Sequence, residues 1–218
     1  MSTLGIIRVL TTTDPILLHE HGKQIEDKFQ IKTISACIPD QPNGIHDDET
    51  EKTAIPKIIQ LARHLVEKDK VSVIAISCAA DPGLAEVRKA VSVPVIGAGS
   101  TGAFNALMFS KNVGIIGITK EAPISIKNIV GRHLVGYESI EGVTRTNDLF
   151  QSNSVQRACQ SIQKLLDKGA KAILFACTGF STIELAAEAR KCFKVPIIDL
   201  VEAQGIASLS LLSQEGRV

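Results

Sequence analysis

The chain contains two similar stretches about half its length apart, Val71-Ser-Val-Ile-Ala-Ile-Ser-Cys78 and Ala170-Lys-Ala-Ile-Leu-Phe-Ala-Cys177. Each is a short aliphatic run without polar alternation, which is typical of a strand buried on both faces of a parallel sheet. Each ends in a cysteine and continues through small residues and a helical pattern. Each then reaches a Val-Pro-[Val/Ile]-Ile run, at residues 93–96 and 195–198. Internal repetition of this kind predicts two related halves.

The same pattern extends along the rest of the chain. Gly5-Ile-Ile-Arg-Val9 matches Gly114-Ile-Ile-Gly-Ile118, and amphipathic helical patterns such as residues 53–68 and 155–168 lie between the aliphatic runs. The alternation of strands and helices predicts an α/β fold with two pseudo-symmetric halves, each a small parallel sheet flanked by helices. The predicted strands are residues 5–10, 31–37, 71–77, 93–97, 113–119, 172–176 and 195–200.

The repeat also predicts a division of the chain. We assign residues 1–97 to the first half and residues 98–199 to the second, and we expect residues 200–218 to pack back on the first half. Ligands of open parallel sheets bind beyond the carboxyl ends of the strands, so an active site is expected in the cleft between the halves.

Composition excludes several classes of protein. The 218 residues include 24 Lys+Arg and 23 Asp+Glu, with 44% apolar and only 4% aromatic residues. A nearly neutral chain without a basic block lacks the charge that nucleic-acid binding requires. No apolar segment is long enough to be a signal peptide or a membrane span. We therefore expect a cytoplasmic homo-oligomer that acts on a small molecule, with no nucleic acid or membrane as a partner.

The five cysteines stand at positions 37, 78, 159, 177 and 192. Their odd number and the absence of a C-x-x-C pair argue against a disulfide framework, and no Cys/His cluster has the spacing of a metal site. Cys78 and Cys177 occupy matched positions at the ends of predicted strands. We expect Cys37, Cys159 and Cys192 to be ordinary buried thiols, since free cysteine is among the most buried residue types.

Helix-start signals follow both matched cysteines. Asp81-Pro82 predicts a helix N-cap with proline at the first helical position, and Ser181-Thr-Ile-Glu184 has the form of a capping box. The nearby N–H groups and the helix dipoles are expected to stabilise a thiolate and to bind anions. Two thiols on either side of one carbon suit a two-base proton transfer, in which one removes a proton and the other delivers one.

Three stretches carry a family resemblance: Cys78-Ala-Ala-Asp81-Pro82-Gly83-Leu84, the Cys177-Thr178-Gly179 turn and residues 114–119. They resemble the Asp/Glu/hydantoin racemase superfamily, and the first is closest to its hydantoin racemase branch. The resemblance implies two pseudo-symmetric domains with the site between them. It also implies racemisation by two cysteines without a cofactor or a metal.

The resemblance further implies a set of binding residues. The backbone after each cysteine would hold the carbonyl or carboxylate oxygens of the substrate and stabilise an enolate. Hydantoin racemases tend to have an Asn-Pro-Asn-Thr-like turn after the first strand, whereas this chain has Arg8-Val-Leu-Thr-Thr-Thr13. An arginine at this place favours a carboxylate. The implied substrate-binding residues are Arg8, Ala79, Ala80, Thr119, Thr178 and Gly179.

These observations predict a cofactor-independent racemase or epimerase acting at a carbon next to a carbonyl, with a hydantoin-type substrate. One alternative is an aspartate/glutamate-type amino-acid racemase. Another is a cis–trans isomerase or decarboxylase of a small dicarboxylate. Outside the enzymes, a ligand-binding or thiol-sensing protein would instead form a reversible Cys78–Cys177 disulfide.

Three other signals point to weaker hypotheses. Residues 97–102 fit G-x-G-x-x-G, but no acidic residue is placed to bind a ribose, so a tight strand–helix turn is the better interpretation. His19-Glu20-His21 lacks H-E-x-x-H spacing and is expected on a solvated helix face. The loop at residues 39–50 is long for this architecture, which suits either an active-site lid or an exposed acidic loop.

Overall fold

The structure is a computed structural model that describes residues 2–213, and these residues form two parallel sheets of four strands each. The strand orders are β2-β1-β3-β4 and β6-β5-β7-β8, so the two halves have the same topology. The α/β fold with two related halves is therefore confirmed. The strands are β1 (Thr3–Arg8), β2 (Lys32–Cys37), β3 (Val73–Ser77), β4 (Val95–Gly97), β5 (Val113–Gly117), β6 (Leu134–Ser139), β7 (Ala172–Phe175) and β8 (Ile197–Ile198).

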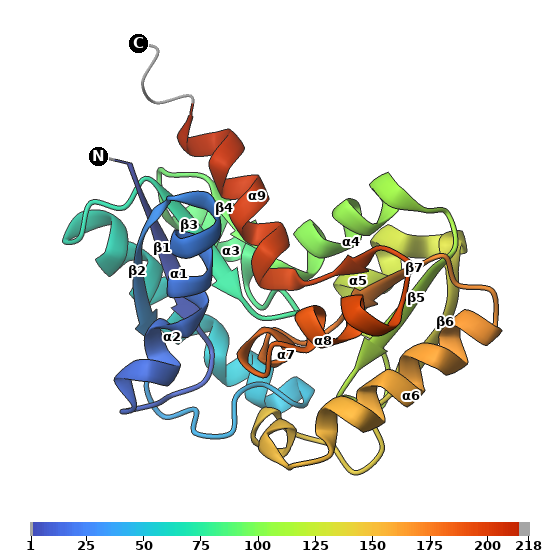
Figure 1. Cartoon of the computed structure of the whole chain (residues 1–218). Helices are drawn as coiled ribbons and strands as arrows, with labels where there is room; N and C mark the ends of the chain where they lie inside the picture. The colour runs from blue at the N-terminus through green and yellow to red at the C-terminus, as the bar shows by residue number, and fades with distance from the viewer. Residues whose placement is uncertain (1, 214–218) are drawn as a thin grey trace.

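Helices cover both faces of each sheet (Figure 1). The helices are α1 (Pro15–Phe29), α2 (Asp48–Glu67), α3 (Leu84–Ala90), α4 (Ala98–Phe109), α5 (Ile124–Val130), α6 (Ser154–Asp167), α7 (Gly179–Thr182), α8 (Leu185–Cys192) and α9 (Leu200–Leu212). Within residues 2–213, no helix has both the length and the apolar character needed to cross a membrane.

Strand β1 shows why the aliphatic runs lack polar alternation. Ile7 packs with Ile58 of α2 on one face of the sheet, and Ile6 packs with Ile25 of α1 on the other. All four side chains are at most 1% exposed. Because both faces of the strand are covered, every position along it favours an apolar side chain.

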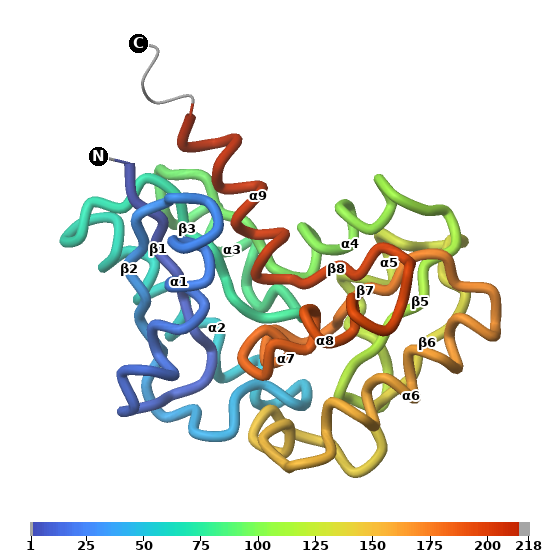
Figure 2. Tube along the Cα trace, viewed as in Figure 1, coloured from blue at the N-terminus to red at the C-terminus, as the bar shows by residue number. Residues whose placement is uncertain are grey.

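The chain crosses between the halves at α4 and again at α9 (Figure 2). Helix α9 follows β8 of the second sheet, yet it packs against α1 and β3 of the first half and alongside α4. The two sheets are thereby joined by helices rather than by a linker.

The carboxyl ends of the strands position the site. In the first half β1 lies between β2 and β3, so the connections from β1 and β2 run to opposite sides of β1. Such a switch in strand order opens a crevice at the carboxyl ends of the strands. Arg8, the last residue of β1, is in register with Cys37 of β2 and Ser77 of β3.

Some element boundaries differ from the sequence-based predictions. The predicted strand at 195–200 is reduced to β8, because Asp199 is the N-cap of α9. Strand β6 was not predicted; it lies at the edge of its sheet, is only partly buried and carries polar residues. The helix predicted at 53–68 begins earlier, at Asp48, where Asp47 forms a capping box with Thr50.

Candidate active site

A pocket of about 650 Å³, its open mouth included, lies between the two sheets at the carboxyl ends of their strands. All eight residues that the sequence predicted for the site line this pocket. Its described lining consists of Arg8, Val9, Leu10, Gly44, Ile45, Ser77, Cys78, Ala79, Ala80, Ile118, Thr119, Pro123, Thr146, Ala176, Cys177, Thr178 and Gly179.

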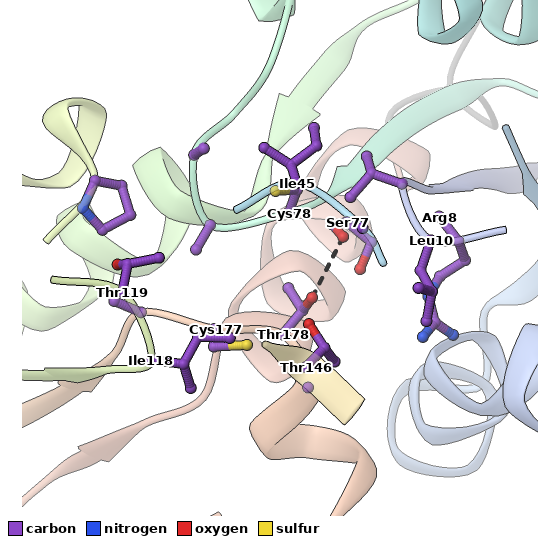
Figure 3. Close-up of a pocket in the computed structure, with 17 residues that line it drawn as sticks. Arg8, Leu10, Ile45, Ser77, Cys78, Ile118, Thr119, Thr146, Cys177 and Thr178 are labelled. Carbon is purple, nitrogen blue, oxygen red and sulfur yellow. Dashed lines mark hydrogen bonds between the residues drawn. The ribbon is translucent and has the colours of Figure 1, made fainter. Parts of the chain in front are cut away.

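The two matched thiols lie on opposite walls of the pocket (Figure 3). Cys78 directly follows β3 and is partly exposed, while Cys177 lies two residues beyond β7 and is 8% exposed. Cys37, Cys159 and Cys192 are not among the described lining residues. Cys192 is exposed and the other two are partly exposed, so the expectation of three buried thiols is wrong.

Burial controls the protonation of both site thiols. It raises the pKa of Cys78 to about 12, against a hydrogen bond from the Ala80 backbone that acts to lower it. It raises the pKa of Cys177 to about 11, against hydrogen bonds with the Gly179 backbone and the Thr146 hydroxyl. The backbone N–H groups after each cysteine do favour the thiolate, as expected, but the loss of hydration on burial has the larger effect on the pKa of both thiols.

The backbone amides after the cysteines have matched roles in the two halves. Ala80 and Gly179 each lie two residues after a cysteine, and the N–H of each donates to the corresponding sulfur. These amides therefore face the pocket beside the thiols. Donors in this position also suit an oxyanion that develops on a substrate.

Asp81 does not cap the helix that follows it, contrary to the sequence-based prediction. Helix α3 begins only at Leu84, with Gly83 as its N-cap. The Asp81 carboxylate instead accepts hydrogen bonds from the Gly99 and Ser100 N–H groups, at 2.7 and 2.6 Å. The Cys78 loop is thus joined to the N-terminus of α4.

In the second half the cysteine loop is also joined to a helix N-terminus, but here the aspartate belongs to the helix N-terminus rather than to the cysteine loop. Asp199 caps α9 by accepting from the Val201 and Glu202 N–H groups. It also accepts from the Ser181 hydroxyl, at 2.8 and 2.7 Å to its two oxygens. Ser181 therefore does not act as an N-cap, and the predicted capping box with Glu184 is wrong. In each half an aspartate ties the cysteine loop to the helix after the next strand.

Gly97 makes room for the Asp81 carboxylate. A Cβ at position 97 would lie 2.3 Å from Asp81 Oδ1. This close approach accounts for the first glycine of the G-x-G-x-x-G pattern. Because Asp81 already occupies the amides at the start of α4, the phosphate position of a dinucleotide site is filled by a protein carboxylate.

We expect Gly97→Ala to destabilise the protein by about 2 kcal/mol, since the added methyl group must displace a buried, hydrogen-bonded carboxylate. Gly136→Ala is the matched control, because a Cβ there meets nothing closer than 3.5 Å. Urea unfolding of both variants measures the difference. Equal midpoints for the two would show that Gly97 is not needed for this contact.

Arg8 lines the pocket, but its guanidinium points toward α1 rather than between the thiols (Figure 3). It is 6% exposed and donates from Nη1 to the carbonyls of Leu17 and Leu18, at 2.6 and 3.3 Å. Burial lowers its pKa to about 10, partly offset by the negative charge of Glu20. Arg8 remains charged at neutral pH and is partly engaged by the protein itself.

Thr119 lies two residues beyond the end of β5 and lines the pocket from the second half. Its hydroxyl donates to the Glu121 carbonyl at 2.7 Å, and its own carbonyl accepts from the Tyr137 hydroxyl at 2.7 Å. The Thr119 Oγ1 can therefore accept a hydrogen bond from a ligand more readily than donate one.

Thr146 lines the pocket although the sequence did not predict it, and the loop at 39–50, considered above as a lid, also contributes to the pocket. Thr146 begins a 3₁₀ helix far along the chain from either cysteine, in a segment without a recognisable pattern. Gly44 and Ile45 bring the loop to the pocket wall. The Gln41 amide donates to the Gly44 and Thr50 carbonyls at 3.2 and 3.0 Å, so the loop is anchored.

His21 does not lie on a solvated face, as the sequence suggested. It is 1% exposed, and its Nδ1 lies 2.8 Å from the Ser77 hydroxyl. Within residues 2–213, no group of three or more His, Cys, Asp and Glu side chains is arranged to hold a metal ion.

Comparison with known proteins assigns the chain to a family. Residues 21–204 match the model of the Asp/Glu/Hydantoin racemase family. This match spans most of the chain, which therefore belongs to that family, a family of isomerases. No curated protein sequence matches the chain significantly.

Solved structures share the fold at low sequence identity. An allantoin racemase from Klebsiella pneumoniae superposes with a TM-score of 0.78 at 21% identity, over 99% of this chain and 89% of that one. A glutamate racemase from Bacillus anthracis gives 0.68 at 17%, over 99% and 83%. An arylmalonate decarboxylase gives 0.62 at 16%, over 97% and 92%.

Proposed function

We propose that the protein is a cofactor-independent racemase or epimerase in which Cys78 and Cys177 transfer protons at a carbon next to a carbonyl. The observation that carries the proposal is the placement of these two thiols on opposite walls of one pocket (Figure 3). A carbon held between them would be accessible to one sulfur on each face. Inversion requires a proton to leave one face and another to arrive at the opposite face.

The protons and electrons of this reaction balance between the substrate and the two cysteines, so no co-reactant is needed. One cysteine, as thiolate, takes the proton from the carbon and becomes a thiol, and the C–H electron pair passes into an enolate. The other cysteine donates its proton to the opposite face and becomes the thiolate. The Ala80 and Gly179 amides, beside the two sulfurs, would stabilise the negative charge on the enolate oxygen.

We propose a hydantoin-type substrate. Among the described lining residues Arg8 is the one charged side chain, and it is already hydrogen bonded to α1. A dicarboxylate would bring two negative charges into a pocket with a single, partly engaged cation, which costs desolvation energy. A hydantoin is nearly neutral and presents carbonyls that backbone amides can bind. The fold likeness to an allantoin racemase agrees with this choice.

The test uses single enantiomers of 5-benzylhydantoin, allantoin, aspartate and glutamate, with optical rotation followed over time. We expect enzyme-dependent loss of rotation with one of the two hydantoins and none with the amino acids. The Cys78→Ser/Cys177→Ser double variant corrects for spontaneous racemisation. Racemisation of aspartate or glutamate alone would favour the amino-acid alternative. In a parallel assay with an arylmalonate, release of CO₂ by an enzyme that racemises none of these four compounds would favour decarboxylation.

A further inference from the structure

A buried polar cluster lies behind the two cysteines, around His21 of α1. The ring is 1% exposed and is not among the described residues that line the pocket. Its Nδ1 lies 2.8 Å from the Ser77 hydroxyl of β3, in the first half. Its Nε2 lies 3.4 Å from the Thr182 hydroxyl of α7, in the second half. One imidazole thus connects the two halves.

The ring is neutral at ordinary pH. Burial and the nearby positive charge of Arg8 lower the pKa of His21 well below its usual value, while a hydrogen bond with the Thr178 backbone acts to raise it. A neutral imidazole has one N–H donor and one acceptor nitrogen. It can therefore donate to a carbonyl on one side and accept from a hydroxyl on the other.

Two of the partners of His21, Ser77 and the Thr178 backbone, are immediate neighbours of the two cysteines. Ser77 precedes Cys78, and Thr178 follows Cys177. The two partners also contact one another, since the Thr178 hydroxyl donates to the Ser77 carbonyl at 3.3 Å, the dashed line in Figure 3. The segments next to the two thiols are therefore in direct contact with one another.

Two further contacts hold the segments around His21 in place. The Gln204 amide of α9 donates to the Ile76 carbonyl at 3.0 Å, so the end of β3 is bound from another element. On α1, a Cβ at Gly22 would lie 2.5 Å from Thr33 Oγ1, which shows how closely the helix approaches β2 beside His21. This packing holds the backbone of α1 that carries His21. The position of the ring therefore fixes the positions of Ser77 and Thr178, to which it is hydrogen bonded.

We propose that His21 is a positioning residue, which holds the Cys78 and Cys177 loops at the separation that proton transfer between them requires. The inference rests on the proposed function. A displacement of about 1 Å between reacting groups can cost about 100-fold in rate. His21 acts through Ser77 and Thr178 and does not touch the substrate.

The test compares His21→Phe with His21→Gln, in the hydantoin assay above. Phenylalanine keeps a planar aromatic ring, somewhat larger than imidazole, but loses every hydrogen bond of His21, while glutamine keeps a donor and an acceptor. We expect kcat to fall about 100-fold in His21→Phe and about tenfold in His21→Gln, with KM changed less than about threefold. His64→Gln, at an exposed histidine on α2, is the control that keeps full activity.

A second readout needs no substrate. We expect His21→Phe to change the rates at which iodoacetamide alkylates both Cys78 and Cys177, measured by peptide mass spectrometry. If His21→Phe does not fold, Ser77→Ala removes only one hydroxyl and is expected to lower kcat about tenfold. A folded His21→Phe or Ser77→Ala with wild-type kcat and alkylation rates would overturn the inference, as would a phenylalanine variant more active than the glutamine variant.

The same assay separates this inference from the function on which it rests. If the Cys78→Ser and Cys177→Ser variants remain active, the proposed function fails. If those variants are inactive while His21→Phe has full activity, the proposed function stands and the positioning role is wrong.

Discussion

Cys78→Ser and Cys177→Ser are each expected to lower the racemisation rate by about 10³-fold, because a serine hydroxyl is far less acidic than a thiol and cannot serve as the base. The remaining thiol still faces one side of the substrate carbon. Each variant should therefore still exchange the proton of one enantiomer with solvent without inverting it. Chiral chromatography measures inversion, and deuterium uptake measures exchange.

Cys192→Ser is the matched control for these variants. Cys192 is exposed at the end of α8 and does not line the pocket, so the same chemical change should leave the rate unaltered. Inversion at the wild-type rate in either pocket variant would contradict the assignment of that cysteine.

The second large effect is expected in the dependence of rate on pH. In the proposed mechanism the thiolate is the base, and the pKa values of about 12 for Cys78 and about 11 for Cys177 lie above neutrality. Below the pKa, each unit of pH raises the thiolate fraction tenfold. We therefore expect kcat/KM to rise about tenfold per pH unit between about pH 6.5 and 8.5. A plateau across this range would contradict raised thiol pKa values in the free enzyme.

Thr146→Val gives this prediction a control. The Thr146 hydroxyl lowers the pKa of Cys177, so its removal should raise that pKa. Where Cys177 is the base, the rate at a given pH should fall by a few-fold while the slope stays the same. A change of slope would instead indicate that Thr146 has another role in the reaction.

The arrangement of the two halves could be predicted from the sequence because the repeat is local. The matched runs that end at Cys78 and Cys177 predicted two strands at equivalent places, and the rule for parallel sheets predicted that both would end at the cleft. The partly buried edge strand β6 lacks this aliphatic signal, so it could not be recognised in the same way.

Asp81 shows why local motifs failed near the site. Asp81-Pro82-Gly83 has the composition of a helix start, and sequence offers no measure of competing partners further along the chain. In the fold, Gly97 leaves a space that the carboxylate enters, and two N–H groups of α4 replace the local cap. This is a tertiary contact overriding a local propensity.

Thr146 and His21 could not be found for a related reason. Each reaches the cysteine loops from a distant segment, and neither lies in a pattern that distinguishes it from a surface residue. The site therefore combines a predictable repeat with partners that only the folded chain brings together.

Deuterium labelling during inversion tests the two-thiol account most directly. One enantiomer of a 5-substituted hydantoin that the enzyme accepts is incubated in D₂O, and both enantiomers are analysed early in the reaction. With Cys78 and Cys177 on opposite faces, the product should carry one deuterium while the recovered substrate carries none. Deuterium appearing equally in recovered substrate and product would indicate a single base, and would contradict the account.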